Sequence, residues 1–168
     1  MIAFLIVIFL SVAITVFVKA WDANVQKQNL EKQGTKVSSM FIATYLGGIP
    51  SFNITSPCDA SIVLDDNIGI ISIVCNDEKE LISYNNVKTI SNETKESLSA
   101  LRLLAIGIFA FAFKSKTNYF RITYTNDINE EVTIVFQSNS SPAIVSKILN
   151  HRYNYLQSNI NEEVTSVS

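Results

Sequence analysis

The amino-terminal run from Ile2 to Val18 carries no charged side chain, and it constrains this chain more than any other feature. As an α-helix it would be about 26 Å long, the short end of a membrane span. Lys19 can extend its stem toward the headgroups and Trp21 suits the interface, which improves the match to a bilayer. We therefore predict a transmembrane anchor over residues 1–20, in contact with the lipid bilayer through residues 2–18.

A cleaved signal peptide is the alternative interpretation of this run. The sequence Val18-Lys19-Ala20 offers small residues at which a signal peptidase could cut. However, the first four residues hold no Lys or Arg, and the apolar stretch is longer than the usual core of a signal peptide. These two features favour an uncleaved anchor.

Lysines flank the anchor on one side only. Lys19, Lys27, Lys32 and Lys36 all follow the run, and no charged side chain precedes it. The positive-inside rule therefore predicts a single-pass protein of the cell membrane, with its amino terminus outside and the rest of the chain in the cytoplasm.

The charge balance and the cysteine count exclude several classes of protein. Thirteen Lys and Arg against 15 Asp and Glu give a net charge of −2, so we predict no nucleic-acid partner. Two cysteines and one histidine are too few for a disulfide framework or a zinc cluster, and we predict no metal and no cofactor. With 168 residues, the chain has room for one domain and a short extra element.

The chain after the anchor divides into three segments. Polar residues 21–44 predict a stalk or linker, helical as far as Gly34. The stretch "YLGGIPSFNITSPCD", Tyr45–Asp59, has two glycines and two prolines and marks a boundary. We predict a folded domain over residues 45–158, followed by a flexible polar tail over residues 159–168.

The stretch from Cys58 to Cys75 predicts a β-hairpin. Small or apolar residues alternate with mostly polar ones along its first half, as in a half-buried strand. Asp66-Asn67 can form a two-residue turn, because both residues tolerate positive φ. That turn places Cys58 opposite Cys75, with Cα atoms within about 7 Å. A longer turn that runs to Gly69 shifts the register by one or two residues.

The next part of the chain predicts a strand and then a helix. Residues 81–90 form the strand, after a charged turn over residues 77–80. The segment from Ser91 to Leu104 opens with Ser and Thr as caps and with acids near its start, which is typical of a helix.

The second apolar run, Leu101–Phe113, is too short to span a bilayer unaided. Phe109, Phe111 and Phe113 alternate with small residues, a period that favours a strand. We predict the end of a helix followed by a strand. A second membrane span or a re-entrant segment is the alternative.

Two more strands and a helix complete the pattern. The stretches "YFRITYT", 119–125, and "EEVTIVFQS", 130–138, alternate apolar and polar residues. Ser141 as the N-cap and Pro142 as the first helical residue predict the start of an amphipathic helix. Its predicted apolar stripe comprises Ile144, Val145, Ile148, Leu149, Tyr153 and Leu156.

This order of elements resembles the pleckstrin-homology-like superfold, and in particular the bacterial domains of that kind that are attached to membrane helices. The residues that carry the resemblance are "YLGGIP", "RLLAIGIFAFAFKSK", "YFRITYT" and the last helix, within Tyr45–Gln157. The resemblance implies an α+β fold: a mostly antiparallel, bent sheet or partial barrel capped by a carboxyl-terminal amphipathic helix. It also implies binding or assembly near a membrane rather than catalysis.

Residues with catalytic potential are few. His151 is the single histidine, and no nucleophile or acid can be placed near it from the sequence, so a surface or helix-end role is favoured. Glu130-Glu131 is interpreted as a solvated pair in a turn. We therefore predict no catalytic residues and no enzyme.

The resemblance also raises the question of lipid binding. A phosphoinositide site of this superfold needs Lys or Arg around the first hairpin turn, whereas this chain has Asp65-Asp66-Asn67, which would repel phosphate. Lys114 and Lys116 form the nearest basic patch. They are candidate contacts with an anionic membrane surface, each worth about 1 kcal/mol. A solvated hairpin turn is the alternative.

Two functions from different classes follow. The first is a non-enzymatic, membrane-tethered interaction or scaffold module on the cytoplasmic side, with a protein partner whose identity the sequence does not specify. Cys58 and Cys75 would then be free thiols. The second is an exported or outward-facing ligand-binding domain in which the same pair is oxidised. The sequence does not specify the oligomeric state.

Overall fold

The computed structural model of this chain describes residues 25, 28, 36–54, 56–94 and 118–166, with side chains up to Ile160. The chain divides into two compact units, Met1–Val37 and Ser38–Ser168. In the first unit Val25 and Gln28 are helical. The predicted anchor over residues 2–18 and the predicted elements within residues 95–117 lie outside the described residues. Among the described helices, none has the length and apolar character needed to cross a bilayer.

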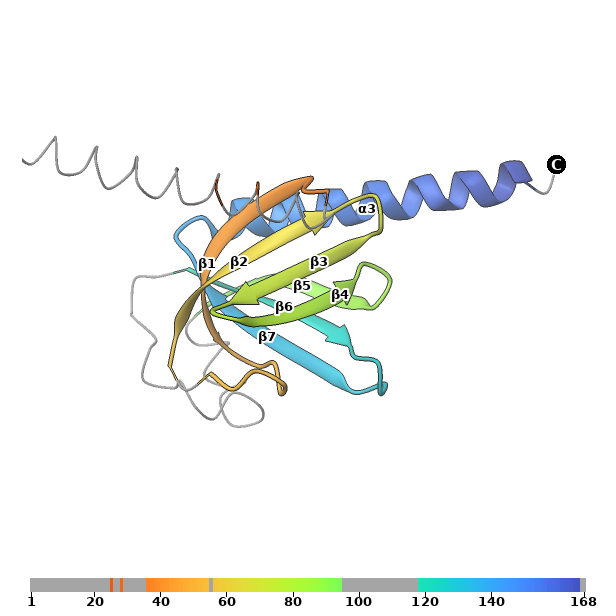
Figure 1. Ribbon diagram of the computed structural model, residues 1–168. Helices are drawn as coiled ribbons and strands as arrows, with labels where there is room; N and C mark the ends of the chain where they lie inside the picture. The colour runs from red at the N-terminus through yellow and green to blue at the C-terminus, as the bar shows by residue number, and fades with distance from the viewer. Residues whose placement is uncertain (1–24, 26–27, 29–35, 55, 95–117, 167–168) are drawn as a thin grey trace, which may run out of the picture. The chain divides into compact units, whose positions relative to one another are not determined.

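The second unit is a seven-stranded antiparallel sheet followed by one helix, which confirms the predicted α+β class. The strand order is β4-β3-β2-β1-β7-β6-β5, so β1 joins the group β1–β4 to the group β5–β7. In Figure 1 the first group passes in front of the second, with α3 along one end of the strands. The elements are β1 Ser39–Gly47, β2 Cys58–Asp65, β3 Ile70–Cys75, β4 Glu78–Ser83, β5 Val87–Glu93, β6 Tyr119–Thr125, β7 Glu131–Gln137 and α3 Ser141–Ser166.

The hydrophobic core lies between the two groups of strands. Alternate residues of β2, β6 and β7 point into it, as their sequence pattern predicts, and Ile62, Ile122 and Ile134 are fully buried. Phe120 and Phe136 stack across β6 and β7 with ring centroids 5.0 Å apart. Full burial of side chains of this size stabilises a fold by about 1.5–3 kcal/mol each, so this cluster makes a large favourable contribution to folding.

The hairpin of β2 and β3 has the longer turn that runs to Gly69, rather than the two-residue turn at Asp66-Asn67. Ile62 pairs with Ile73 and Ala60 with Cys75, so the prediction of a two-residue turn at Asp66-Asn67 is wrong by two residues of register. Gly69 takes a positive φ of 63°, and the Asn67 backbone N–H donates to Asp65 Oδ1 at 3.1 Å, which closes the wider turn. Because a shift of two residues keeps every side chain on its face, the predicted core residues remain in the core.

The folded unit begins earlier than the predicted boundary at residue 45. Strand β1 starts at Ser39, inside the segment predicted as a stalk, and pairs with both β2 and β7. Ala43 and Tyr45 are buried and alternate with the more exposed Ile42 and Thr44, and Leu46 and Gly47 are buried as well. The alternation is short and follows a polar stretch, which explains why the sequence pattern did not separate this strand from the stalk.

The predicted strand over residues 81–90 is two strands. Strand β4 ends at Ser83 and β5 starts at Val87, because Tyr84–Asn86 form a turn in which the Asn86 N–H donates to the Ser83 carbonyl at 3.0 Å. Glu78–Glu80 belong to β4 rather than to a charged turn. Strand β5 runs on to Glu93, so the helix predicted to open at Ser91 does not start there.

Helix α3 is longer than predicted, and it buries only part of the predicted stripe. Ile144, Val145 and Ile148 are buried, and Tyr155 joins them against the core, whereas Leu149 is 40% exposed and Tyr153 is 63% exposed. The helix continues to Ser166, through most of the segment predicted as a flexible tail over residues 159–168.

Ser141 fixes the beginning of α3 through contacts with the sheet and not as the predicted N-cap. The Ser141 side chain is fully buried, and its hydroxyl lies 2.9 Å from Asn92 Oδ1 and 3.0 Å from the Tyr119 carbonyl. It therefore ties the helix start to β5 and β6 instead of capping its own helix.

Candidate binding site

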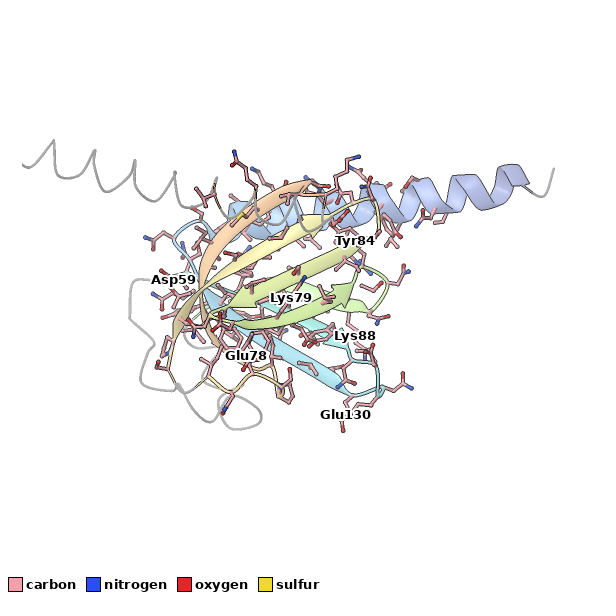
Figure 2. All side chains as sticks on the ribbon, viewed as in Figure 1. Asp59, Glu78, Lys79, Tyr84, Lys88 and Glu130 are labelled. Carbon is pink, nitrogen blue, oxygen red and sulfur yellow. A yellow bond between two sulfur atoms is a disulfide. The ribbon has the colours of Figure 1, made fainter. Side chains whose placement is uncertain are left out.

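A hollow of about 280 Å³ opens at the end of the strands remote from α3. Three segments that are far apart in the sequence line it: the loop after β1, the middle of β4, and the end of β6 with the turn that leads into β7. Figure 2 shows Glu130, on that last turn, at this end of the unit. The lining residues are Ile49, Pro50, Ser51, Glu80, Tyr124, Asn126, Asp127, Ile128, Glu130 and Val132.

Gly47 and Gly48, at the end of β1, place the following loop against the backbone of β7. Gly48 has a φ of 114°, and a Cβ at this position would collide with the backbone of Thr133 and Ile134. The Ile49 N–H then donates to the Tyr45 hydroxyl at 2.9 Å, which fixes the loop where it forms one wall of the hollow. The "GGIP" motif therefore shapes this site rather than a flexible boundary between a stalk and a domain.

Tyr124 and Glu80 form the floor of the hollow. The Tyr124 hydroxyl donates to Glu80 Oε1 at 2.6 Å, and the Tyr124 side chain is almost fully buried. Burial, followed by the hydrogen bond to Glu80, raises the pKa of Tyr124 above its ordinary value near 10. Tyr124 is thus a neutral donor at physiological pH, and Glu80 keeps an acceptor oxygen at the hollow.

The opposite rim is acidic and partly apolar. Asp127 and Glu130 come from the turn, and none of the described residues that line the hollow is Lys or Arg. Ile128 is 72% exposed, an unusual position for a side chain of this kind next to two acids. Carboxylates around apolar contacts match a Lys or Arg side chain, which has an aliphatic stem and a cationic head.

Sequence reasoning missed this site. Glu130 was interpreted as a solvated turn residue, and the residues that line the hollow with it come from β4 and from the loop after β1, about 50 and 80 positions earlier in the chain. The turn signal Asn126-Asp127 was visible, but nothing local connected it to Glu80. The Asn126 side chain accepts from the Ile128 and Glu130 backbone N–H groups, at 3.2 and 2.8 Å, and holds the turn in shape.

A second polar cluster lies where α3 meets the start of β1 and the β2–β3 turn. His151 Nδ1 is 2.6 Å from Asp66 Oδ2, and His151 Nε2 is 2.8 Å from Ser39 Oγ. The Tyr84 hydroxyl donates to Asp66 Oδ1 at 2.8 Å. The sequence placed no acid or nucleophile near His151, because the partners that the structure brings to it lie 85 and 112 residues away in the chain.

The order Ser39–His151–Asp66 is that of a nucleophile, a base and an acid in a serine hydrolase. Such an enzyme also needs oxyanion donors and a place for substrate beside the serine. The hollow described above shares no residue with this cluster. Arg152, next to His151, donates to the Tyr84 and Val87 carbonyls at 2.8 and 3.0 Å. These contacts together join α3 to the sheet.

Cys58 and Cys75 are joined in a disulfide, with Cα atoms 6.5 Å apart. The pair is thus oxidised in the structure, where the sequence argument for a cytoplasmic domain expected free thiols. Because Cys75 pairs with Ala60, the bond runs diagonally between β2 and β3 rather than between directly opposed residues.

The remaining candidate residues are the two lysines of the predicted basic patch and the acidic turn between β2 and β3. Lys114 and Lys116 lie outside the described residues. The acidic turn predicted to repel phosphate is engaged within the fold, since Asp66 contacts both His151 and Tyr84. Across the part of the chain that the structure describes, no group of three or more His, Cys, Asp or Glu side chains could hold a metal ion.

No family model matches the chain, and no curated protein matches it. Among solved structures it is similar to the inner membrane complex sub-compartment protein 3 of Toxoplasma gondii. The TM-score is 0.39 and the sequence identity is 8%, over 72% of this chain and 80% of that chain. Similarity at this level supports no argument about function.

Proposed function

We propose that this chain is a non-enzymatic, membrane-tethered interaction module with a pleckstrin-homology-like domain. The observation that carries the proposal is the strand order β4-β3-β2-β1-β7-β6-β5 followed by a carboxyl-terminal helix packed at β5 and β6. This supports the resemblance drawn from the sequence, which implies binding rather than catalysis. The uncharged run over residues 2–18 supplies the tether.

The partner is a protein that presents a basic segment. Support comes from the hollow, in which the carboxylates of Glu80, Asp127 and Glu130 surround apolar contacts. A Lys or Arg head would pair with the acids while its stem packs on Ile49 and Ile128. The same acids would disfavour a phosphate or another anion.

A photo-cross-linking amino acid at Ile128, in the full chain in its native membranes, tests this proposal. We expect an adduct with a basic segment of one protein, identified by mass spectrometry, and a strong loss of that adduct when Asp127→Asn and Glu130→Gln are added. The same cross-linker at Asn154, an exposed position on α3, is the control. Equal adducts at both positions, or an adduct with an acidic segment, would contradict the proposal.

The non-enzymatic part of the proposal has its own test at the Ser39–His151–Asp66 cluster. We expect the full chain and its Ser39→Ala variant to hydrolyse an activated ester, p-nitrophenyl acetate, at the same slow rate. A rate that falls at least about tenfold in the variant would show that Ser39 is a nucleophile and that the module is an enzyme.

The side of the membrane on which the domain lies is part of the proposal. The one-sided lysines support the cytoplasm. The Cys58–Cys75 disulfide favours the second candidate function, an exported or outward-facing ligand-binding domain, because disulfides persist in oxidising compartments.

Labelling of a reporter cysteine placed at Ser168 in intact cells separates the two candidates. If the domain is cytoplasmic, a membrane-impermeant maleimide leaves the reporter unlabelled and acid-trapped cells yield Cys58 and Cys75 as thiols. Labelling together with a trapped disulfide would establish the outward-facing domain. A mature chain that starts near Trp21 would show that the run is a cleaved signal peptide.

A further inference from the structure

Helix α3 carries two apolar faces, of which the sheet covers one. Its inner face consists of Ile144, Ile148 and Tyr155, which pack on the core. Leu149, Tyr153, Leu156 and Ile160 lie on another side, roughly 130° round the helix at 100° per residue. We call these four residues the outer stripe. Leu149, Tyr153 and Ile160 are 40%, 63% and 53% exposed.

The spacing of the outer stripe is that of a coiled coil. Its residues are separated by four, three and four positions, the alternation of the d and a positions in a heptad. His151 falls on the opposite side of the helix from this seam, where it contacts Asp66 and Ser39, so the sheet leaves the seam free. Figure 1 shows that α3 continues past the strands at its carboxyl-terminal end.

The residues that flank the outer stripe indicate what covers it. Three of the four flanking residues, Asn150, Gln157 and Asn159, are polar and uncharged, and the fourth, Arg152, is bound to carbonyls of the sheet. Two copies of this surface can therefore meet without strong repulsion between like charges. A membrane surface is a poorer match, because helices that bind anionic lipid have Lys and Arg beside the apolar stripe. Lys147 instead lies 5.8 Å from the centre of the Phe41 ring, and Arg152 binds two carbonyls of the sheet.

We infer that the outer stripe is the interface of a homodimer, in which α3 of one chain packs against α3 of a second copy. The contact is isologous, with Tyr153 and Ile160 of each chain in the seam. Such a seam is short. A tether in the same membrane raises the effective concentration of the second copy, which favours a dimer in the membrane over one in solution. The preference for a dimer in the membrane rests on the proposed tether, whereas the interface itself does not.

Cysteine cross-linking of the full chain in membranes tests the interface. The variants Tyr153→Cys and Ile160→Cys place a thiol in the seam, while Asn154→Cys and Ser158→Cys place one on the exposed remainder of the helix. We expect a bis-maleimide to give covalent dimers with the first two variants, at least about tenfold more than with the other two. Equal yields at all four positions would overturn the inference.

A second measurement keeps the test independent of the cross-linker. Mass photometry of the full chain in nanodiscs or mild detergent should find dimers for the native chain and monomers for Tyr153→Glu/Ile160→Glu, with the same thermal midpoint for the sheet. Dimers that persist in the Glu variant would overturn the inference. The inference would also be overturned if the native chain is a monomer and the thiol of Tyr153→Cys does not react with maleimide, because another segment of the chain would then cover the outer stripe. Neither result depends on the acidic hollow.

Discussion

At the scale of single residues, buried hydroxyl and carboxylate groups join elements that are distant in the sequence. Tyr84 and Tyr124 each donate to a carboxylate, of Asp66 and Glu80, and His151 bridges Asp66 and Ser39. None of these pairs is visible as a motif, because each depends on where the chain returns. Their sum decides how firmly the helix and the two strand groups are held together.

The first prediction concerns His151. Replacement by Ala removes two hydrogen bonds, so that Asp66 and Ser39 each lose a hydrogen-bond partner at a partly buried position. We expect His151→Ala to lower the free energy of unfolding by about 1–3 kcal/mol. Urea denaturation of the full chain in detergent measures this value, with Asn154→Ala, an exposed residue of the same helix outside the outer stripe, as the control. A change under about 0.5 kcal/mol would show that the cluster contributes little to the fold.

The second prediction concerns alkaline pH. Burial, then the hydrogen bond to Asp66, raises the pKa of Tyr84 above 10.0, and burial with the Glu80 contact does the same for Tyr124. Above about pH 10 the unfolded chain loses these protons while the folded chain keeps them. Stability is therefore complete below about pH 10 and falls above it, by up to about 1.4 kcal/mol per pH unit for each tyrosine.

The matched comparison is Tyr84→Phe/Tyr124→Phe. This variant should unfold more easily at neutral pH but lose stability less steeply between about pH 10 and 11. Equal alkaline slopes for the native chain and the double variant would contradict the assignment.

At the scale of elements, the local pattern of apolar and polar residues predicted the strands and the helix that bury one face. Strands β2, β6 and β7 follow alternation, and the first two turns of α3 follow helical spacing, because burial on one face dictates both. The register of the β2–β3 hairpin depends on the length of its turn, and the sequence allowed either a short turn at Asp66-Asn67 or a longer one that includes Gly69. The inner apolar face and the outer stripe of α3 were predicted from the sequence as a single stripe, because a sequence pattern cannot show which apolar residues the sheet covers.

The third prediction belongs to the element that shapes the hollow. Gly48 has a positive φ, and its Cα faces the backbone of β7. Gly48→Ala adds both backbone strain and a collision that a flexible side chain cannot relieve, so we expect a loss of about 2–4 kcal/mol. Ser51→Ala, in the same loop, should cost less than about 0.5 kcal/mol.

Thermal melts of the two variants measure the difference. We also expect Gly48→Ala to reduce cross-linking at Ile128, since the loop would move away from the turn into β7. A variant as stable as the native chain would show that the loop does not need this close approach.

At the scale of the whole molecule, part of the order of elements could be predicted while the site could not. Strands β2, β6 and β7 and the last helix follow from apolar patterning along the chain, whereas β1 was assigned to the stalk and β4 and β5 were merged into one strand. The hollow is assembled from the β1–β2 loop, β4 and the β6–β7 turn, so its acidic character appears only after the sheet has formed. The same holds for the outer stripe, whose exposure depends on how α3 sits on β5 and β6.

The central claim is that the acidic hollow binds a basic segment, and a peptide titration tests it most directly. The full chain is placed in nanodiscs of zwitterionic lipid, and fluorescence anisotropy measures Kd for a short Arg- and Leu-containing peptide and for its Glu counterpart. The account predicts that the Arg peptide binds at least about tenfold more tightly, a difference of about 1.4 kcal/mol, and that this preference disappears in Asp127→Asn/Glu130→Gln and weakens in salt. Equal affinity for the two peptides, or a preference that survives in the variant, would contradict it.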